Sequence, residues 1–351
     1  MQIIKSGQAR GYKDFDFTHK YYLASADGLD ERQLQKGDIL INSTGVGTAG
    51  RVTLFDLDGL FVADSHITIL RLDQKRTLPG YVLYALAHIG FKNIEAMANG
   101  ASGQIELPLS TIERIKIPLP PLAVQQQIVA EIEAIEAQEA VDKQQIQECR
   151  EEMEQVMENM PGTPTPVRSL AQINPPKDEV AKLPADSLVS FIDMASLSNE
   201  GGITHNEDRP LSAVQKGYTY FREGDVLFAK ITPCMENGKG ALAIGLTNKI
   251  GFGSTEFFVI RPNGLLKAEL LYRFLQRRSY RAEAEKVMTG ASGHRRVPKT
   301  FLENTLVNVP SPAEQETLAI QLQNLENRIR EAQARLAGVA GQKAEVLKRY
   351  L

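Results

Sequence analysis

Ten polar or basic side chains in two separate parts of the chain have the chemistry that contact with a nucleic acid requires. Arginine suits the O6 and N7 acceptors of guanine, glutamine suits adenine, and lysine and serine suit phosphate oxygens. The candidates in the first part are Thr44, Arg51, Ser102 and Gln104. Those in the second part are Lys230, Lys239, His294, Arg295, Arg296 and Lys299. Because a basic loop is often only solvated, these assignments depend on the organisation of the whole chain.

A glycine-rich stretch, residues 45–50, fits the G-x-G-x-x-G pattern of dinucleotide-binding proteins. That pattern must open a helix and be followed by an acidic residue about 20 positions later. Asp64 is near that distance, but residues 51–55 predict a β-strand. We therefore expect a glycine turn and no bound dinucleotide.

A second motif, Asn174-Pro175-Pro176-Lys177, is similar to the N-P-P-aromatic motif of adenine methyltransferases. It lacks the aromatic residue that would stack on a flipped base, and no glycine-rich AdoMet loop precedes it. We expect an extended loop here.

Histidine and cysteine residues are too few and too scattered to predict a catalytic or metal site. The five histidines, at positions 19, 66, 88, 205 and 294, lie far apart. Cys149 and Cys234 form no CxxC motif, which favours a reducing compartment and no structural zinc. We therefore expect a non-enzymatic protein with no cofactor and no metal.

The composition is that of an ordinary soluble protein, long enough at 351 residues for two or three domains. No stretch approaches 18 apolar residues and the first residues lack a signal-peptide layout, so we expect a cytoplasmic protein without a membrane partner. The net charge is −3, but the acidic excess lies in residues 121–160, with ten Asp or Glu and two Lys or Arg. A local basic face elsewhere is therefore compatible with the net charge.

Two long helices are the elements that must organise these candidates. The first is expected within residues 118–160, since prolines open it and no Pro or Gly follows until Pro161-Gly162. The second is expected within residues 310–351. Each carries an apolar stripe that repeats about every 3.5 residues, which predicts an antiparallel coiled coil. The alternative is that both helices only pack on a larger core.

Polar residues interrupt both stripes. Glu139 and Asp142 interrupt the first stripe, and Lys343 interrupts the second. In an antiparallel pair of full length, we expect residues 326–332 to lie opposite the two acids. Arg328 and Arg330 would then neutralise them.

The sequence repeats itself. The matching segments are Gly37–Leu40 with Gly224–Leu227, residues 65–71 with 255–261, residues 100–103 with 290–293, and Pro120 with Pro310. Internal repeats of this kind indicate duplicated modules. We expect an α+β fold with two repeated modules, each of mixed and mostly β structure and each followed by a long helix. The expected boundaries are 1–117 and 161–309 for the modules, and 118–160 and 310–351 for the helices.

The two copies differ mainly in their polar loops. Residues 104–106 are Gln-Ile-Glu in the first copy, and the matching residues 294–296 are His-Arg-Arg. A shared scaffold with different loops indicates two binding modules with different targets, and drift after duplication is the alternative. Residues 167–190 have no counterpart ahead of Met1, so we expect a first module that is shortened or completed by another chain.

The whole layout resembles the DNA-specificity (S) subunit of type I restriction–modification enzymes. The Gly-Asp turns at 37–38 and 224–225 carry this resemblance, with the Gly-Ala-Ser-Gly loops and the entries into both helices. It implies that each module is a target-recognition domain for one half of a split DNA site. It implies that the paired helices fix the spacing between the half-sites.

The resemblance also implies the partners. They are double-stranded DNA, two methyltransferase (modification) subunits and, through these, restriction (motor–nuclease) subunits that serve DNA methylation and defence against foreign DNA. The chain itself would have no catalytic activity. Two alternatives remain: a half-type or orphan specificity protein that needs a second chain, and a coiled-coil scaffold with no DNA role.

Overall fold

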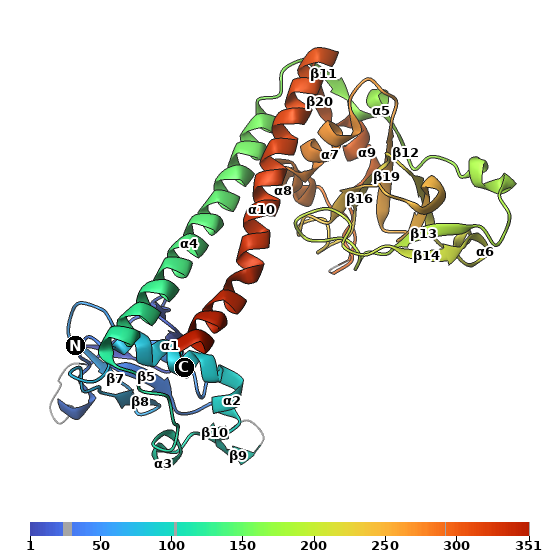
Figure 1. Ribbon diagram of the computed structural model, residues 1–351. Coiled ribbons are helices and arrows are strands. Elements are labelled where there is room, and N and C mark those ends of the chain that lie inside the picture. The colour runs from blue at the N-terminus through green and yellow to red at the C-terminus, as the bar shows by residue number, and fades with distance from the viewer. Residues whose placement is uncertain (24–29, 102–103, 292, 351) are drawn as a thin grey trace. The chain divides into compact units, whose positions relative to one another are not determined.

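The computed structural model describes residues 1–23, 30–101, 104–291 and 293–350. The chain divides into two compact units (Figure 1). Unit 1 comprises Met1–Lys143 with Gln333–Leu351, and unit 2 comprises Gln144–Ala332. The two long helices, α4 (Leu122–Glu158) and α10 (Pro312–Tyr350), each contribute to both units.

Unit 1 is built on two small sheets. One sheet is antiparallel in the order β6 (Val52–Leu54), β5 (Ile39–Asn42), β8 (Ile67–Leu70). The other has the order β4 (Tyr21–Tyr22), β1 (Gln2–Ile4), β7 (Phe61–Ala63), with β1 and β7 parallel. The remaining elements are β2 (Ala9–Gly11), β3 (Asp14–Phe15), β9 (Asn99–Ala101), β10 (Gln104–Glu106), η1 (Asp30–Arg32), α1 (Pro79–Ile89), α2 (Phe91–Glu95) and α3 (Leu109–Ile112).

The core of unit 1 forms around α1. A proline at the start of this helix suits its first turn, and every side chain from Tyr81 to Leu86 is buried. The buried face of β5 packs on one side of α1, and Ile128 and Ile132 of α4 pack in the same cluster. Val346 of α10 joins it. Both long helices are therefore part of the unit 1 core and not separate from it.

Unit 2 repeats this plan with additional elements. Its antiparallel sheet has the order β12 (Ala171–Ile173), β19 (Phe257–Pro262), β16 (Val226–Ala229), β17 (Gly240–Leu242). Its second sheet has the order β14 (Glu207–Pro210), β13 (Leu188–Ile192), β18 (Ile250–Gly253), β15 (Thr219–Arg222), with β13 and β18 parallel. The remaining elements are β11 (Thr163–Pro166), β20 (Leu306–Val309), α5 (Val167–Leu170), α6 (Leu211–Val214), α7 (Ala268–Gln276), α8 (Arg278–Lys286), α9 (Lys299–Asn304), η2 (Asp178–Lys182) and η3 (Thr247–Lys249).

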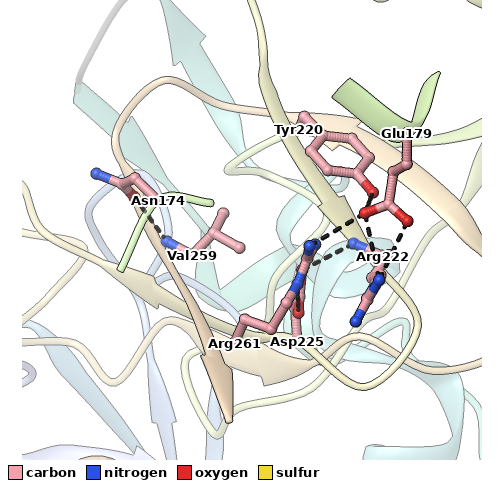
Figure 2. A network of polar contacts seen from close by, with 7 residues as sticks. All are labelled: Asn174, Glu179, Tyr220, Arg222, Asp225, Val259 and Arg261. Atoms are coloured by element: carbon pink, nitrogen blue, oxygen red, sulfur yellow. Dashed lines mark hydrogen bonds and ion pairs between the residues drawn. The ribbon is translucent and has the colours of Figure 1, made fainter. Parts of the chain in front are cut away.

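The repeated Gly-Asp turn has the same structural role in both units. The buried Asp225 carboxylate accepts hydrogen bonds from Arg261 Nε at 2.8 Å and Nη2 at 2.7 Å, and from the backbone of Arg222 at 2.9 Å (Figure 2). Asp38 of unit 1 binds Arg71 in the same bidentate way, at 3.0 and 2.8 Å. A two-pronged ion pair of this kind fixes the end of one strand to the turn before its neighbour.

Glu179 extends this network in unit 2. Its carboxylate accepts hydrogen bonds from Tyr220, from Arg222 at 3.1 Å and from Arg261 at 3.0 Å (Figure 2). Burial acts to raise the pKa of Glu179, but the hydrogen bonds from Tyr220 and Arg222 outweigh it and lower the pKa. The short η2 helix is therefore fixed to the strands of unit 2 through one ionised side chain.

The two long helices pack against each other, as the apolar stripes predict (Figure 1). In unit 1 they run antiparallel, since Glu131 binds Arg349 at 3.0 Å while Asp142 binds Arg335 at 2.8 Å. In unit 2, Arg328 lies 3.9 Å from Glu152. The predicted α+β fold with two repeated modules and an antiparallel helix pair is confirmed.

The prediction that Arg328 and Arg330 neutralise Glu139 and Asp142 is wrong. Asp142 binds Arg335, and Glu139 binds Lys343 at 3.3 Å, so the polar residues of the two stripes meet each other. The expectation assumed that the helices pair along their full lengths. Instead, the pair has a different register, with Glu131 opposite Arg349 and Asp142 opposite Arg335.

Candidate nucleic-acid interface

Two segments of unit 2 bring several of the predicted residues together. One is the loop of residues 230–239 between β16 and β17, and the other comprises residues 289–297. The Val297 amide donates to the Lys230 carbonyl at 2.9 Å, and the Thr232 amide donates to the Arg295 carbonyl at 3.0 Å. These bonds define the unit 2 cluster, which consists of Lys230, His294, Arg295 and Arg296 with Glu236, Glu256 and Glu285.

Arg296 is held in a fixed orientation within this cluster. Its Nε and Nη2 atoms donate to the two carboxylate oxygens of Glu256 at 2.9 and 2.7 Å, and its Nη1 donates to the His294 carbonyl at 3.0 Å. The hydrogen bond from Arg296 lowers the pKa of Glu256 and raises the pKa of Arg296 itself. A pre-oriented guanidinium loses little freedom when it contacts a base.

The other cations of the cluster are also matched by carboxylates or carbonyls. Lys230 is half-buried, its Nζ donates to the Thr255 carbonyl at 2.8 Å, and burial lowers its pKa. Arg295 lies 3.6 Å from Glu236 and 3.7 Å from Glu285. Three cations thus face three carboxylates, so the cluster is close to neutral and is not a basic face.

Two predicted residues of unit 2 have different partners. Lys239 Nζ donates to the Met194 carbonyl at 2.7 Å. Lys299 pairs with Glu303 at 3.2 Å, one turn along α9.

In unit 1, Thr44 and Arg51 lie in the loop between β5 and β6. Thr44 Oγ1 lies 3.0 Å from His66 Nδ1. Arg51 Nη2 donates to the Gly47 carbonyl at 2.5 Å, which fixes the shape of its own glycine loop. The backbone of Gln104 lies in β10, and Ser102 lies outside the described residues.

The glycine stretch is a turn, as predicted. Gly45, Gly47 and Gly50 have φ values of 93°, 75° and 86°, which favour glycine. A Cβ on Gly50 would lie 2.9 Å from the backbone nitrogen of Glu95. The loop leads into strand β6 and not into a helix, so the geometry of a dinucleotide site is absent from this stretch.

Asn174 of the Asn-Pro-Pro-Lys motif has a structural role. Its backbone amide donates to the Val259 carbonyl at 2.7 Å, and its side-chain Oδ1 accepts from the Val259 amide at 3.0 Å (Figure 2). Its φ of 53° allows this two-sided contact with one residue. The motif therefore continues the edge pairing of β12 along β19.

The structure also identifies residues that the sequence analysis did not select. Glu256 and His66 occupy matching turns, 190 positions apart, at the starts of β19 and β8. His66 contacts Thr44 in unit 1, and Glu256 binds Arg296 in unit 2. The offset of 190 residues that matches β8 with β19 also matches His66 with Glu256. The sequence did not single out this pair because histidine and glutamate differ in chemical type.

A polar cavity of about 620 Å³ adjoins His66 in unit 1. Lys5 Nζ lies 3.9 Å from the centre of the Tyr21 ring, and Arg10 pairs with Asp16 at 2.6 Å. Cations beside an exposed aromatic ring suit the phosphates and bases of a nucleic acid. Among the residues that line this cavity, His66 occupies the position that matches Glu256 of the unit 2 cluster.

Two further properties concern the described part of the chain only. It contains no group of three or more His, Cys, Asp or Glu residues that could hold a metal ion. None of its helices has the length and apolar character needed to cross a membrane.

Two curated proteins show clear sequence similarity to this chain. The specificity subunit of the Escherichia coli type I restriction enzyme EcoAI is 37% identical over 163 residues, which is 46% of this chain and 27% of that protein. The EcoEI specificity subunit from the same species is 36% identical over 148 residues, which is 42% of this chain and 24% of that protein. The matched region thus spans about a quarter of each relative.

Two solved structures share the fold. One is a chain of a type I R-M system described for its complex assembly and conformational transition. It has a TM-score of 0.58 and 16% identity, over 99% of this chain and 90% of that chain. The other is the type I restriction-modification system S subunit from M. genitalium. It has a TM-score of 0.53 and 13% identity, over 100% of this chain and 88% of that chain.

A family profile covers most of the sequence. The type I restriction modification DNA specificity domain matches residues 2–150 and again residues 189–338. The two matches fall on the two copies of the repeated fold. The chain therefore belongs to the family of type I restriction modification DNA specificity domains.

Proposed function

We propose that this chain is the DNA sequence-recognition subunit of a type I restriction–modification system, in which each module recognises one half of a bipartite site. The observation that carries the proposal is the repeated scaffold with different side chains at matching positions. Unit 1 presents His66, which contacts Thr44, where unit 2 presents Glu256, which binds Arg296. Arg296 itself matches Glu106 of unit 1. Two such surfaces would select two different half-sites.

The proposal assigns residues 1–117 and 161–309 to recognition, and residues 118–160 and 310–351 to the spacing of the half-sites. The ten residues selected from the sequence remain proposed contacts, and Lys5, His66 and Glu256 are added to them. The helix pair would also dock two methyltransferase subunits, because a duplicated chain offers two similar surfaces. Methyl transfer and DNA cleavage are assigned to these subunits and to the restriction subunits bound through them, within the cytoplasm.

A module exchange tests the proposal. The chain is produced with its methyltransferase subunits, and the methylated sites are mapped by sequencing before and after residues 170–309 are replaced by those of another family member. We expect one half of the recognised site to change and the other half to persist. A change in both halves, or in neither, would contradict the assignment of one half-site to each module.

Salt dependence separates this function from that of a scaffold with no DNA role. Binding of the assembled complex to duplex DNA should weaken steeply as salt rises, because phosphate contacts release counterions. A binding signal that does not respond to salt would favour the scaffold. A control complex that lacks this chain should show no sequence preference.

A further inference from the structure

A short helix follows the core helix of each unit and contacts a loop that carries candidate DNA contacts. In unit 1 this helix is α2, and the loop comprises residues 43–51 between β5 and β6; it is called the unit 1 loop. In unit 2 the helix is α8, and the loop comprises residues 230–239 between β16 and β17; it is called the unit 2 loop. The two helices occupy matching places in the repeat.

In unit 1, the last residue of α2 is bound to the glycine turn. The Glu95 carboxylate accepts a hydrogen bond from the Gly47 amide at 2.5 Å. At the other end of the helix, the Phe91 ring centre lies 5.8 Å from the Arg51 guanidinium, which itself binds the Gly47 carbonyl. The helix therefore contacts the unit 1 loop through a backbone group and through a side chain.

In unit 2, Arg281 makes the corresponding contact from the interior. Arg281 matches Phe91 at the offset of 190 and is only 5% exposed. Its Nη1 donates to the Met235 carbonyl of the unit 2 loop, and its Nη2 donates to Gln276 Oε1 at 2.8 Å. Its guanidinium lies 5.0 Å from the centre of the Phe228 ring of β16. One buried cation thus joins helix, loop and strand.

The packing of the core does not require a cation at this position. Within the described ranges, no carboxylate pairs with Arg281, and its Nε has no hydrogen-bond partner. Burying a cation among neutral acceptors costs free energy, and an apolar side chain of similar length would fill the space without that cost. Costly arrangements of this kind are typical of positions that a function requires.

The Met235 carbonyl is the point at which the unit 2 loop enters the core. Met235 is fully buried, and the Gly238 amide also donates to its carbonyl, at 3.1 Å. The next residue, Glu236, accepts a hydrogen bond from Thr232 and lies 3.6 Å from Arg295. The contact that holds Met235 therefore also fixes the position of Glu236 beside Arg295.

We propose that Arg281 and Glu95 are positioning residues for the recognition surfaces of unit 2 and unit 1, and that neither contacts DNA. Each holds one loop in the shape in which the polar side chains of its unit meet a half-site. Two loops of different sequence are thus fixed from the same helix of the repeat. The role in half-site preference rests on the proposed function, whereas the binding of each loop to its helix does not.

Hydrogen exchange on the full-length chain without DNA tests whether Arg281 holds the unit 2 loop. In Arg281→Met, amides of residues 230–239 should exchange about tenfold faster, while those of β19 keep their protection. Because the variant removes a buried charge, its Tm should stay the same or rise. Glu283→Gln, at an exposed position of α8, should change neither quantity. Unchanged exchange in residues 230–239 would overturn the role of Arg281.

Two variants of Glu95 provide a matched test in unit 1. Glu95→Gln keeps an oxygen that accepts from the Gly47 amide, whereas Glu95→Leu has none. Exchange in residues 45–50 should be about tenfold faster in the leucine variant and within about threefold of the natural rate in the glutamine variant. Equal exchange in the two variants would overturn the role of Glu95.

Competition binding of the complex assembled with methyltransferase subunits tests the effect on recognition, with oligonucleotides altered in one half-site at a time. Arg281→Met should lower the preference in one half-site about tenfold, and Glu95→Leu should do so in the other. Arg281→Lys, which keeps a cation near the Met235 carbonyl, should retain most of the preference.

The outcomes separate this inference from the proposed function. A loss in both half-sites from one variant, or a loss in neither, would overturn the positioning role. A natural complex with no half-site preference would instead overturn the proposed function, and hydrogen exchange alone would then decide whether α2 and α8 hold the loops.

Discussion

Gln125 and Gln315 make the same three hydrogen bonds in the two units. Gln125 accepts from the Leu78 amide at 2.9 Å and donates to the carbonyls of Arg76 and Pro120 at 3.0 and 2.8 Å. Gln315 accepts from the Lys267 amide at 2.9 Å and donates to the carbonyls of Leu265 and Pro310 at 2.9 and 3.0 Å. Both side chains are buried. Each glutamine therefore joins the start of a long helix to the loop before the first core helix of its module.

Removing either glutamine side chain should destabilise its unit. Gln125→Leu removes three part-buried hydrogen bonds to backbone groups, and we expect a loss of about 2–3 kcal/mol in the free energy of unfolding. Gln315→Leu should have a similar effect in unit 2. Urea unfolding monitored by circular dichroism measures the loss. The exposed neighbour in Gln126→Leu is the matched control and should change stability little.

The buried aspartates of the Gly-Asp turns should be equally sensitive. Asp225→Ala leaves Arg261 partly buried without its bidentate partner, and we expect a loss of about 3 kcal/mol in the free energy of unfolding. Asp38→Ala should act in the same way on unit 1, where Arg71 is more exposed, and so cost less. Differential scanning calorimetry of each variant checks the order. Asp186→Ala, which alters an exposed aspartate, should leave the transition where it is.

The helix pair should lose stability in acid. Hydrogen bonds from Arg335 hold the pKa of Asp142 below its ordinary value of 3.8. A lowered pKa in the folded state means that the contribution is fully present above about pH 4 and disappears as the pH falls through the folded value. The Tm of Asp142→Asn should therefore lie below that of the natural protein near neutral pH, and the gap should close below about pH 4.

A control carboxylate on the exposed face of α4 makes the acid experiment specific. Glu148 accepts a hydrogen bond from Gln144 within the helix. Glu148→Gln should follow the natural protein at every pH. A gap between Asp142→Asn and the natural protein that stays constant down to about pH 2 would show that the Asp142 carboxylate does not act through its charge.

The two candidate surfaces should affect different half-sites. Arg296→Ala should weaken binding of the assembled complex to its site by about 1–3 kcal/mol and relax the preference in one half-site only. His66→Ala should relax the other half. Competition with oligonucleotides altered in one half-site at a time measures both effects. The exposed Lys182 lies outside both surfaces, and Lys182→Ala should leave half-site preference unchanged.

Much of the architecture is determined by local sequence pattern. The repeated offset identified both modules, and the apolar stripes with their flanking prolines predicted α4 and α10. The glycine stretch at residues 45–50 predicts a turn, because the residues after it favour a strand. These features depend on neighbours in the chain, so the sequence by itself determines them.

Contacts between distant segments were decided only by the tertiary structure. A stripe of period 3.5 determines which face of a helix is apolar, but not which turn of its partner it meets. For that reason, Arg335 and not Arg328 binds Asp142. Glu256 and Arg296 are 40 residues apart and meet because both of their segments are hydrogen-bonded to the backbone of Lys230. The balance of charge in the unit 2 cluster could therefore not be predicted from the basic residues alone. The pairing of β11 with β20 and of β12 with β19 is likewise a property of the folded sheets and not of the repeat.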